Sequence, residues 1–211
     1  MGEDLTQRLA ISPSRVAVIN NPFDIESILQ QAAEPLSVAG VPYIVHVGRF
    51  HPHKRHDRLL EAFAASGIPA KLVLAGTGNE DQLAKTRDLA LRLGIGDRVV
   101  FAGFQANPYP LIKHARMLVL SSDSEGLGNV LVEALLCGTP VVSTRCPGGP
   151  AEILERMGMS DALAELTADS LAAKIAATWQ SPPFIDSKKL AEYDLEPVCR
   201  QYLALQAKSI R

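Results

Sequence analysis

Two glutamates lie on either side of a glycine-rich turn near the middle of the chain. Glu125 belongs to the polar segment 121–129, and Glu133 lies about one turn inside segment 129–137, whose apolar spacing predicts a helix. Helical rise places the two carboxylates roughly 10 Å apart. That exceeds the roughly 5 Å between the carboxylates of a retaining glycoside hydrolase. The spacing instead suits two acceptors for hydroxyl groups at the two ends of one extended ligand.

The turn between these glutamates is a candidate anion site. Gly126 and Gly128 let the backbone approach a ligand closely, because glycine has no β-carbon. The helix that begins near Asn129 presents free N–H groups and the positive end of its dipole. Phosphate groups bind at such helix N-termini, so the sequence predicts a phosphate-binding turn here.

The sequence lacks the common motifs for dinucleotide binding, for P-loop phosphate binding and for a nucleophilic serine. Gly76 and Gly78 follow a predicted strand, but Asp81 occupies the place of the third glycine in the dinucleotide fingerprint. No Walker sequence and no G-x-S-x-G sequence occurs. Hydride transfer, P-loop chemistry and esterase chemistry are therefore disfavoured, and no cofactor is expected.

Three histidines, His51, His53 and His56, could be interpreted as metal ligands. Lys54 and Arg55 lie among them, and two cations are unfavourable neighbours for a divalent ion. A structural zinc site would also need a fourth ligand. We therefore expect a solvated loop here and no metal.

The segments that must position the turn alternate between strand and helix. Short apolar runs predict buried strands at residues 15–20, 43–48, 71–75, 98–102, 117–121 and 140–144. Helical spacing separates them at residues 58–65, 81–93, 108–115, 129–137 and 149–155. This alternation predicts an α/β fold with a doubly wound parallel sheet of the Rossmann-like type. Ligands of such sheets bind at the carboxyl ends of the strands, where the turn lies.

The pattern weakens after residue 155. Residues 162–166 predict a short strand, 168–179 a helix, 181–183 a break and 195–208 a last helix.

Composition narrows the classes of partner. The net charge is −2, with 47% hydrophobic and 21% charged residues, and no long basic run offers the phosphate-backbone attraction on which nucleic-acid binding depends. No apolar stretch approaches the roughly 18 residues of a membrane span, and the first residues have no secretory pattern. We expect a cytoplasmic protein that binds no nucleic acid.

A longer stretch around the glutamates resembles a known family. Residues 125–142, EGLGNVLVEALLCGTPVV, resemble the signature of the retaining glycosyltransferases of family 4, the group 1 family with the GT-B fold. That family places seven residues between its two glutamates, as here, and follows them with a Gly-x-Pro turn, here Gly138 to Pro140. Similar motifs occur at residues 47–54, 75–78, 100–104 and 148–154, so the resemblance covers roughly residues 15–155.

The resemblance implies a site for a nucleotide diphosphate sugar that requires no metal. Arg49 and Lys54 would hold the donor diphosphate, and Glu125 would lie beside the sugar ring, which makes these three the catalytic residues. Other residues would contact the ribose, the sugar phosphate and the base. This implied substrate-binding set is Glu133 for the ribose, Gly126, Leu127, Gly128 and Asn129 for the sugar phosphate, Phe104 and Gln105 for the base, and Gly48 and Gly76 nearby.

Two departures from the family pattern are visible. Arg55 follows Lys54 where the family commonly has glycine, which would crowd the phosphate loop or add a cation. Residues 155–162 differ from the Asp-Gly segment that precedes the next strand in the family.

The resemblance also implies how the chain is divided. Residues 1–22 would be a linker with a helix at 2–11 and the first strand, and residues 15–194 would be the donor-binding domain. Residues 195–211 would be a C-terminal helix that packs toward an N-terminal domain missing from this chain. That domain would bind the acceptor, and any peripheral membrane association would occur through it. We expect this chain alone to bind a nucleotide sugar weakly and to lack transferase activity.

The predicted function is that of the donor-binding, C-terminal half of a retaining glycosyltransferase of the hexosyl-transferring type. It would move a sugar from a nucleotide diphosphate sugar, preferably a UDP-sugar, to a glycan, lipid or other acceptor in cell-surface polysaccharide biosynthesis. Two alternatives stay open: a stand-alone nucleotide-sugar-binding module without catalysis, and a nucleotide-sugar epimerase on the same fold. The base, the sugar, the acceptor, the linkage and the oligomeric state are not determined by the sequence.

Overall fold

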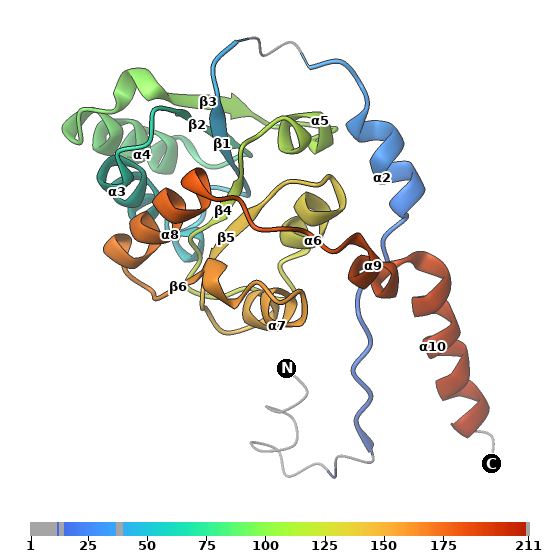
Figure 1. Cartoon of the computed structure of the whole chain (residues 1–211). Coiled ribbons are helices and arrows are strands. Elements are labelled where there is room, and N and C mark those ends of the chain that lie inside the picture. Colours follow the sequence, from blue (N-terminus) through green and yellow to red (C-terminus); the bar gives the residue numbers. More distant parts are fainter. Residues whose placement is uncertain (1–11, 13–14, 37–39, 210–211) are drawn as a thin grey trace.

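One parallel sheet organises the chain (Figure 1). The computed structural model describes residues 12, 15–36 and 40–209. Within them the sheet has six strands in the order β3-β2-β1-β4-β5-β6. The strands are Tyr43–Val47 (β1), Lys71–Ala75 (β2), Val99–Gly103 (β3), Leu118–Leu120 (β4), Val141–Thr144 (β5) and Leu163–Ala164 (β6). This is the doubly wound order, which reverses between β1 and β4 and confirms the predicted fold class.

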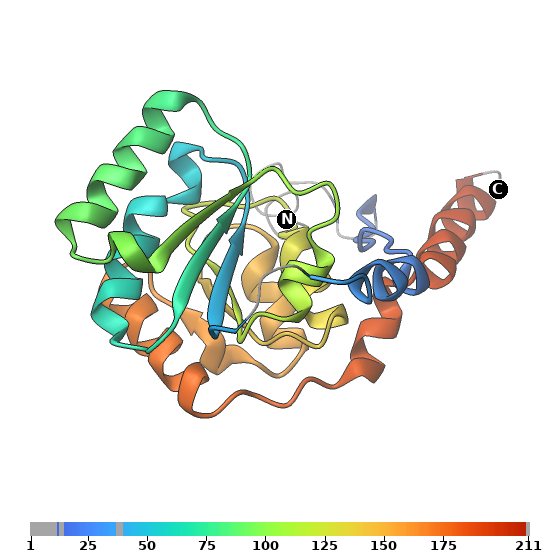
Figure 2. The ribbon, with the colours of Figure 1, turned by 90° about the horizontal axis from the view of Figure 1, so that it is seen from above.

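Helices cover both faces of the sheet (Figure 2). On one face lie His56–Ser66 (α3), Glu80–Arg92 (α4) and Ala168–Gln180 (α8). On the other face lie Tyr109–Lys113 (α5), Asn129–Leu136 (α6) and Gly149–Arg156 (α7). Three further helices, Ile25–Ala32 (α2), Ser187–Leu190 (α9) and Leu195–Ser209 (α10), lie toward one end of the sheet. The crossovers therefore change face once, after β3, where the strand order turns back across the sheet to β4.

The two faces enclose two hydrophobic cores. Successive strand residues point to opposite faces, so Ile44 packs with α3, α4 and α8, while Tyr43 and Val45 pack with α5, α6 and α7. Both sides of the central strands are therefore buried. This explains why those strands are continuous apolar runs in the sequence rather than alternating ones.

The strand predicted at residues 15–20 does not form. Residues 16–22 carry no helix or strand, and Val18 is 57% exposed. This segment runs instead toward the C-terminal part of the chain, where the Phe23 N–H donates to the Tyr193 carbonyl at 2.8 Å. The apolar run resembles a strand locally, but it pairs with none of the six strands of the described sheet. The helix predicted at 2–11 lies outside the described residues.

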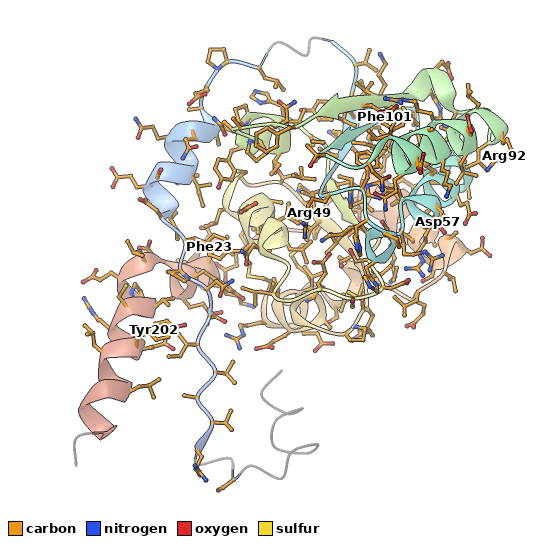
Figure 3. All side chains as sticks on the ribbon, turned by 180° about the vertical axis from the view of Figure 1, so that it is seen from behind. Phe23, Arg49, Asp57, Arg92, Phe101 and Tyr202 are labelled. Carbon is orange, nitrogen blue, oxygen red and sulfur yellow. The ribbon has the colours of Figure 1, made fainter. Side chains whose placement is uncertain are left out.

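The C-terminal predictions are largely confirmed. The short strand β6, helix α8, the break after Gln180 and helix α10 all form. Helices α2 and α9 were not predicted. Helix α10 extends away from the sheet, with Tyr202 and Leu203 55% and 65% exposed (Figures 1 and 3). Among the described residues, no helix is both long enough and apolar enough to cross a bilayer.

Candidate functional site

A polar pocket opens at the carboxyl ends of β1 and β4, where the strand order reverses. In doubly wound sheets this switch point is where ligands bind. The pocket has a volume of about 330 Å³. Its lining comes from the segment before α2, from the end of β1 and the loop after it, from the loop after β4 and from the first residues of α6: Asn21, Val47, Lys54, Glu125, Gly126, Leu127, Gly128, Asn129 and Val130.

An ion pair joins the two loops across this pocket. The Lys54 Nζ lies 2.6 Å from Glu125 Oε1, with 24% and 10% of the two side chains exposed. The Ser122 hydroxyl donates to the same carboxylate oxygen at 2.5 Å. The structure therefore brings together two residues that are 71 positions apart in the sequence. An anion that enters the pocket would compete with Glu125 for the ammonium group.

The N-terminus of α6 forms a second wall of the pocket. Gly128 is the N-cap residue and supplies no side-chain hydrogen bond to the helix. Gly126 has open space where a β-carbon would be. The Leu131 N–H donates to the Gly128 carbonyl at 2.8 Å, which leaves the backbone N–H groups of Asn129 and Val130 for an external acceptor at the positive end of the helix dipole.

The loop after β5 supports this wall from behind. The Glu125 N–H donates to the Pro147 carbonyl at 3.0 Å, and the Gly149 N–H donates to the Gly126 carbonyl at 2.8 Å. A β-carbon on Gly149 would lie 2.2 Å from the Leu127 carbonyl oxygen. Only glycine allows the two backbones to approach this closely.

Two more of the predicted glycines, Gly48 and Gly76, lie against each other behind the first loop. A β-carbon on Gly76 would stand 1.9 Å from the Gly48 carbonyl oxygen. The Gly48 N–H donates to Ala75 at 2.9 Å, so the loops after β1 and β2 leave the sheet together. These glycines shape the loop that carries Arg49 and Lys54, and they are absent from the pocket lining.

Arg49 is exposed at the start of the same loop (Figure 3). It takes part in no hydrogen bond or ion pair with another described residue. Its guanidinium group is therefore free to bind an external anion, although it does not line the pocket in this structure.

Glu133 lies deeper along α6 and also outside the pocket lining. Burial raises the pKa of its carboxyl group. Burial, and then the charge of Glu133, raise the pKa values of Tyr109 and Cys137, the latter to about 11. Glu133 thus faces the region between α5 and α6, where a carboxylate can accept hydrogen bonds from neutral hydroxyl groups.

Phe104 and Gln105 follow β3, toward the edge of the sheet. Phe104 is 73% exposed, and the Gln105 side chain donates to the Ala102 carbonyl at 2.7 Å. Gln105 lines a separate hollow with Tyr43 and Leu111. The structure does not bring these two residues into the pocket of Lys54 and Glu125.

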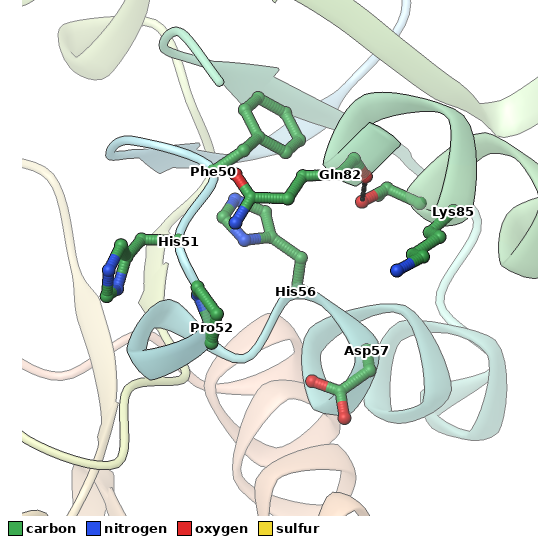
Figure 4. A pocket seen from close by; sticks show the side chains of 8 residues that line it. Phe50, His51, Pro52, His56, Asp57, Gln82 and Lys85 are labelled. Carbon is green, nitrogen blue, oxygen red and sulfur yellow. Dashed lines mark hydrogen bonds between the residues drawn. The ribbon is translucent and has the colours of Figure 1, made fainter. Parts of the chain in front are cut away.

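The expectation of a solvated histidine loop is wrong for one of the three histidines. His51 and His53 are exposed, but His56 is only 7% exposed and stacks on Phe50 with ring centroids 4.2 Å apart (Figure 4). It also meets the fully buried His46 at 4.8 Å. Burial lowers the pKa of His46 to about 4 and that of His56 to about 3. The described residues contain no cluster of metal-ligating side chains.

Arg55 adopts a left-handed backbone conformation with φ of 50°, alone among the described residues other than glycine. The cost is about 1–2 kcal/mol for a residue with a β-carbon, which explains why glycine is common here in the resembled family. Its guanidinium group pairs with Asp57 and Asp123. The extra cation is therefore neutralised by carboxylates of its own chain.

Sequence reasoning missed the contribution of the segment before α2. The Asn21 side chain donates to the Asn129 side chain at 2.9 Å and lines the pocket. Val47 and Val130 complete the wall. The sequence offered no signal for Asn21, because the contact joins residues 108 positions apart.

Comparison with known proteins gives one family. A sequence profile described as glycosyl transferases group 1 matches residues 28–194. The chain is 34% identical over 153 residues to the N-acetylgalactosamine-N,N'-diacetylbacillosaminyl-diphospho-undecaprenol 4-alpha-N-acetylgalactosaminyltransferase of Campylobacter jejuni, covering 72% of this chain and 40% of that protein. It is 43% identical over 112 residues to the lipopolysaccharide core biosynthesis glycosyltransferase LpsE of Rhizobium meliloti, covering 52% of this chain and 32% of that protein.

A solved structure has the same fold as this chain. Anabaena HepE, in complex with UDP-glucose, is 26% identical and superposes with a TM-score of 0.76, covering 95% of this chain and 60% of that chain. The present chain spans 40% or less of the length of the two curated relatives.

Proposed function

This chain belongs to the group 1 glycosyl transferases, and we propose that residues 15–194 form the donor-binding domain of a retaining member. The domain would bind a nucleotide diphosphate sugar, and the protein that contains it would transfer the sugar to a glycan or lipid acceptor. One observation carries the proposal: the pocket joins the Lys54–Glu125 pair to the uncapped N-terminus of α6. This combination offers a cation, a carboxylate and backbone N–H donors to a single ligand.

The donor diphosphate fits between the two loops. Cleavage of the bond between the sugar and the diphosphate leaves negative charge on the diphosphate, and preorganised donors stabilise that charge best. Lys54 and the exposed Arg49 would bind it from one side. The N–H groups at the start of α6 would bind it from the other side. The negative charge on the leaving diphosphate would then be stabilised by side-chain and backbone groups of this chain.

Binding of the diphosphate would also change the partner of Glu125. In the ligand-free pocket this carboxylate accepts from Lys54 and from Ser122. Once Lys54 turns to the diphosphate, Glu125 becomes available to the sugar ring. Glu133 would accept from the ribose hydroxyls, and Phe104 and Gln105 would flank the base.

We propose a uridine nucleotide as the donor and a cell-surface glycan or its lipid-linked precursor as the acceptor. The first rests on Anabaena HepE, which was solved with UDP-glucose. The second rests on the named activities of the Campylobacter and Rhizobium relatives. Because those relatives are much longer than this chain, the acceptor would be bound by a further, N-terminal domain, toward which α10 would pack. A cytoplasmic location is part of the same proposal.

A panel of nucleoside diphosphates and their sugars tests this function. A ligand that binds only the native state raises the unfolding temperature as its concentration increases. We expect UDP and UDP-sugars to give the largest shift, and Lys54→Ala to remove most of it. Lys188→Ala is the matched control, because Lys188 is an exposed cation on α9 outside the pocket. Equal shifts in both variants, or none in the unmodified chain, would exclude the proposed donor site.

A further inference from the structure

We propose that Arg58 and Asp123 form a clamp that sets the position of Lys54 relative to Glu125, and so act as positioning residues for the donor site. The inference rests on the proposed function of that site. Neither residue lines the pocket. Together they tie the start of α3, which directly follows the loop after β1, to the loop after β4, and these two loops carry the Lys54–Glu125 ion pair that does line the pocket.

The clamp lies where the sheet itself stops holding these loops together. Strands β1 and β4 are in register at Val45 and Leu118. Beyond that point, hydrogen bonds outside the sheet ladder connect the two segments: the His46 ring nitrogen lies 2.9 Å from the Val119 carbonyl oxygen, and the Ser121 hydroxyl donates to the Lys54 carbonyl at 2.8 Å. A crevice at a switch point opens because the strand order reverses there. Its width is therefore set by these links rather than by the sheet ladder.

Arg58 makes two of the links. One of its nitrogens donates to the Ser121 carbonyl at 2.8 Å, and the other lies 2.6 Å from the Asp123 carboxylate. The Arg58 side chain is only 5% exposed. It also lies in the first turn of α3, where the helix dipole disfavours a cation. Desolvation and the helix dipole both disfavour a charge at this position. The charged Arg58 side chain is therefore held in place by its contacts with the other loop.

Asp123 completes the connection from the opposite side. Its carboxylate accepts from Arg58 and from Arg55, and these two cations lower the pKa of Asp123. Its backbone N–H donates to the His53 carbonyl at 2.8 Å. The carboxylate and the backbone of one residue thus hold both α3 and the residue that precedes Lys54.

The spacing along the chain explains how the clamp would act. Lys54 directly follows His53, and Glu125 follows Asp123 by two residues. Any movement of Asp123 relative to Arg58 therefore displaces one member of the ion pair from the other. Misplacement of a binding group by about 1 Å can have a large effect on ligand affinity and reaction rate.

A double-mutant cycle separates positioning from general destabilisation. UDP is titrated by NMR, which resolves millimolar dissociation constants, into the 211-residue chain and into D123N, K54A and D123N/K54A. We expect D123N to weaken UDP binding about five- to tenfold in the unmodified background and less than about twofold when Lys54 is absent, because coupled sites are non-additive. Thermal unfolding without ligand confirms that each variant is folded at the assay temperature.

The matched control is D57N. Asp57 also pairs with Arg55, but that ion pair lies within one segment and does not join the two loops. It should change UDP affinity less than about twofold. If D123N does not fold, R58K serves in its place, since it keeps the charge and loses the two-pronged contact.

The outcomes are distinct. An equal effect of D123N in both backgrounds, or no effect in the first, would overturn the clamp while leaving the donor site intact. Failure of the unmodified chain to bind UDP or any other nucleoside diphosphate would overturn the proposed function, and the clamp with it.

Discussion

Gly148 lies so close to Glu125 that a β-carbon at position 148 would stand 2.0 Å from the Glu125 carbonyl oxygen. The backbone at Gly148 also has a φ of 117°, which residues with a side chain rarely adopt. The carboxylate of Glu125 is therefore placed by contact with a loop from the next strand, as well as by its ion pair with Lys54.

Gly148→Ala should displace the loop that carries Glu125. We expect UDP binding to weaken about tenfold or more, because misplaced binding groups lose much of their effect. Calorimetric titration with UDP measures this loss of affinity. Gly138→Ala is the matched control: Gly138 has a similar positive φ of 76°, but nothing lies within 4 Å of its added β-carbon. It should lower stability and leave UDP affinity unchanged. Equal loss of affinity in both variants would contradict the contact with Glu125.

Arg55→Gly and Arg55→Ala separate backbone strain from the ion pairs of Arg55. Both variants lose the contacts to Asp57 and Asp123. Only alanine keeps a β-carbon in the left-handed conformation, so Arg55→Gly should be more stable than Arg55→Ala by about 1–2 kcal/mol. Urea denaturation of the two variants measures the difference. A more stable alanine variant would show that the loop relaxes out of this conformation.

The buried histidines predict acid sensitivity. At pH 7 His46 and His56 are neutral in the folded chain, and most of each histidine is neutral in the unfolded chain. Below about pH 6.5 the unfolded chain takes up protons, whereas the folded chain does not until about pH 4 at His46 and about pH 3 at His56. The free energy of unfolding should therefore fall as the pH is lowered, by up to about 1.4 kcal/mol per pH unit for each histidine.

Denaturation at pH 7 and at pH 5 measures this slope. His56→Phe should reduce it, because the new ring can still stack on Phe50 without taking up a proton. His53→Gln should leave it unchanged, since His53 is exposed. A His56→Phe variant with the slope of the unmodified chain would show that His56 is not responsible.

Glu133 and Lys54 should differ in which part of the donor they bind. Glu133→Ala removes the proposed ribose acceptor, so it should weaken UDP binding about tenfold, as expected for the loss of a charged hydrogen bond. It should not change the binding of inorganic pyrophosphate. Lys54→Ala should weaken both ligands. Competition titrations with the two ligands measure this, and reduced pyrophosphate binding by Glu133→Ala would contradict the assignment to the ribose.

Much of the fold could be predicted from the sequence, because the signals are local. The apolar runs that become β1, β2, β4 and β5 are buried on both faces, and the helices between the strands keep a regular apolar spacing. The phosphate-binding turn is equally local: Gly126, Gly128 and Asn129 are neighbours in the chain, and a helix begins directly after them. The local signal is wrong at residues 15–20, because this run has the composition of a strand but pairs with no strand of the described sheet.

The sequence by itself determined the alternating α/β architecture, the family and the segments that carry the site. Only the tertiary structure decided which of those segments meet. The pairing of Lys54 with Glu125, the contact of Asn21 with Asn129 and the clamp between Arg58 and Asp123 join residues 71, 108 and 65 positions apart. Periodicity encodes how a segment folds along its own length. Contacts between distant segments depend on how closely their backbones approach, and that distance is set by the packing of the sheet and its loops.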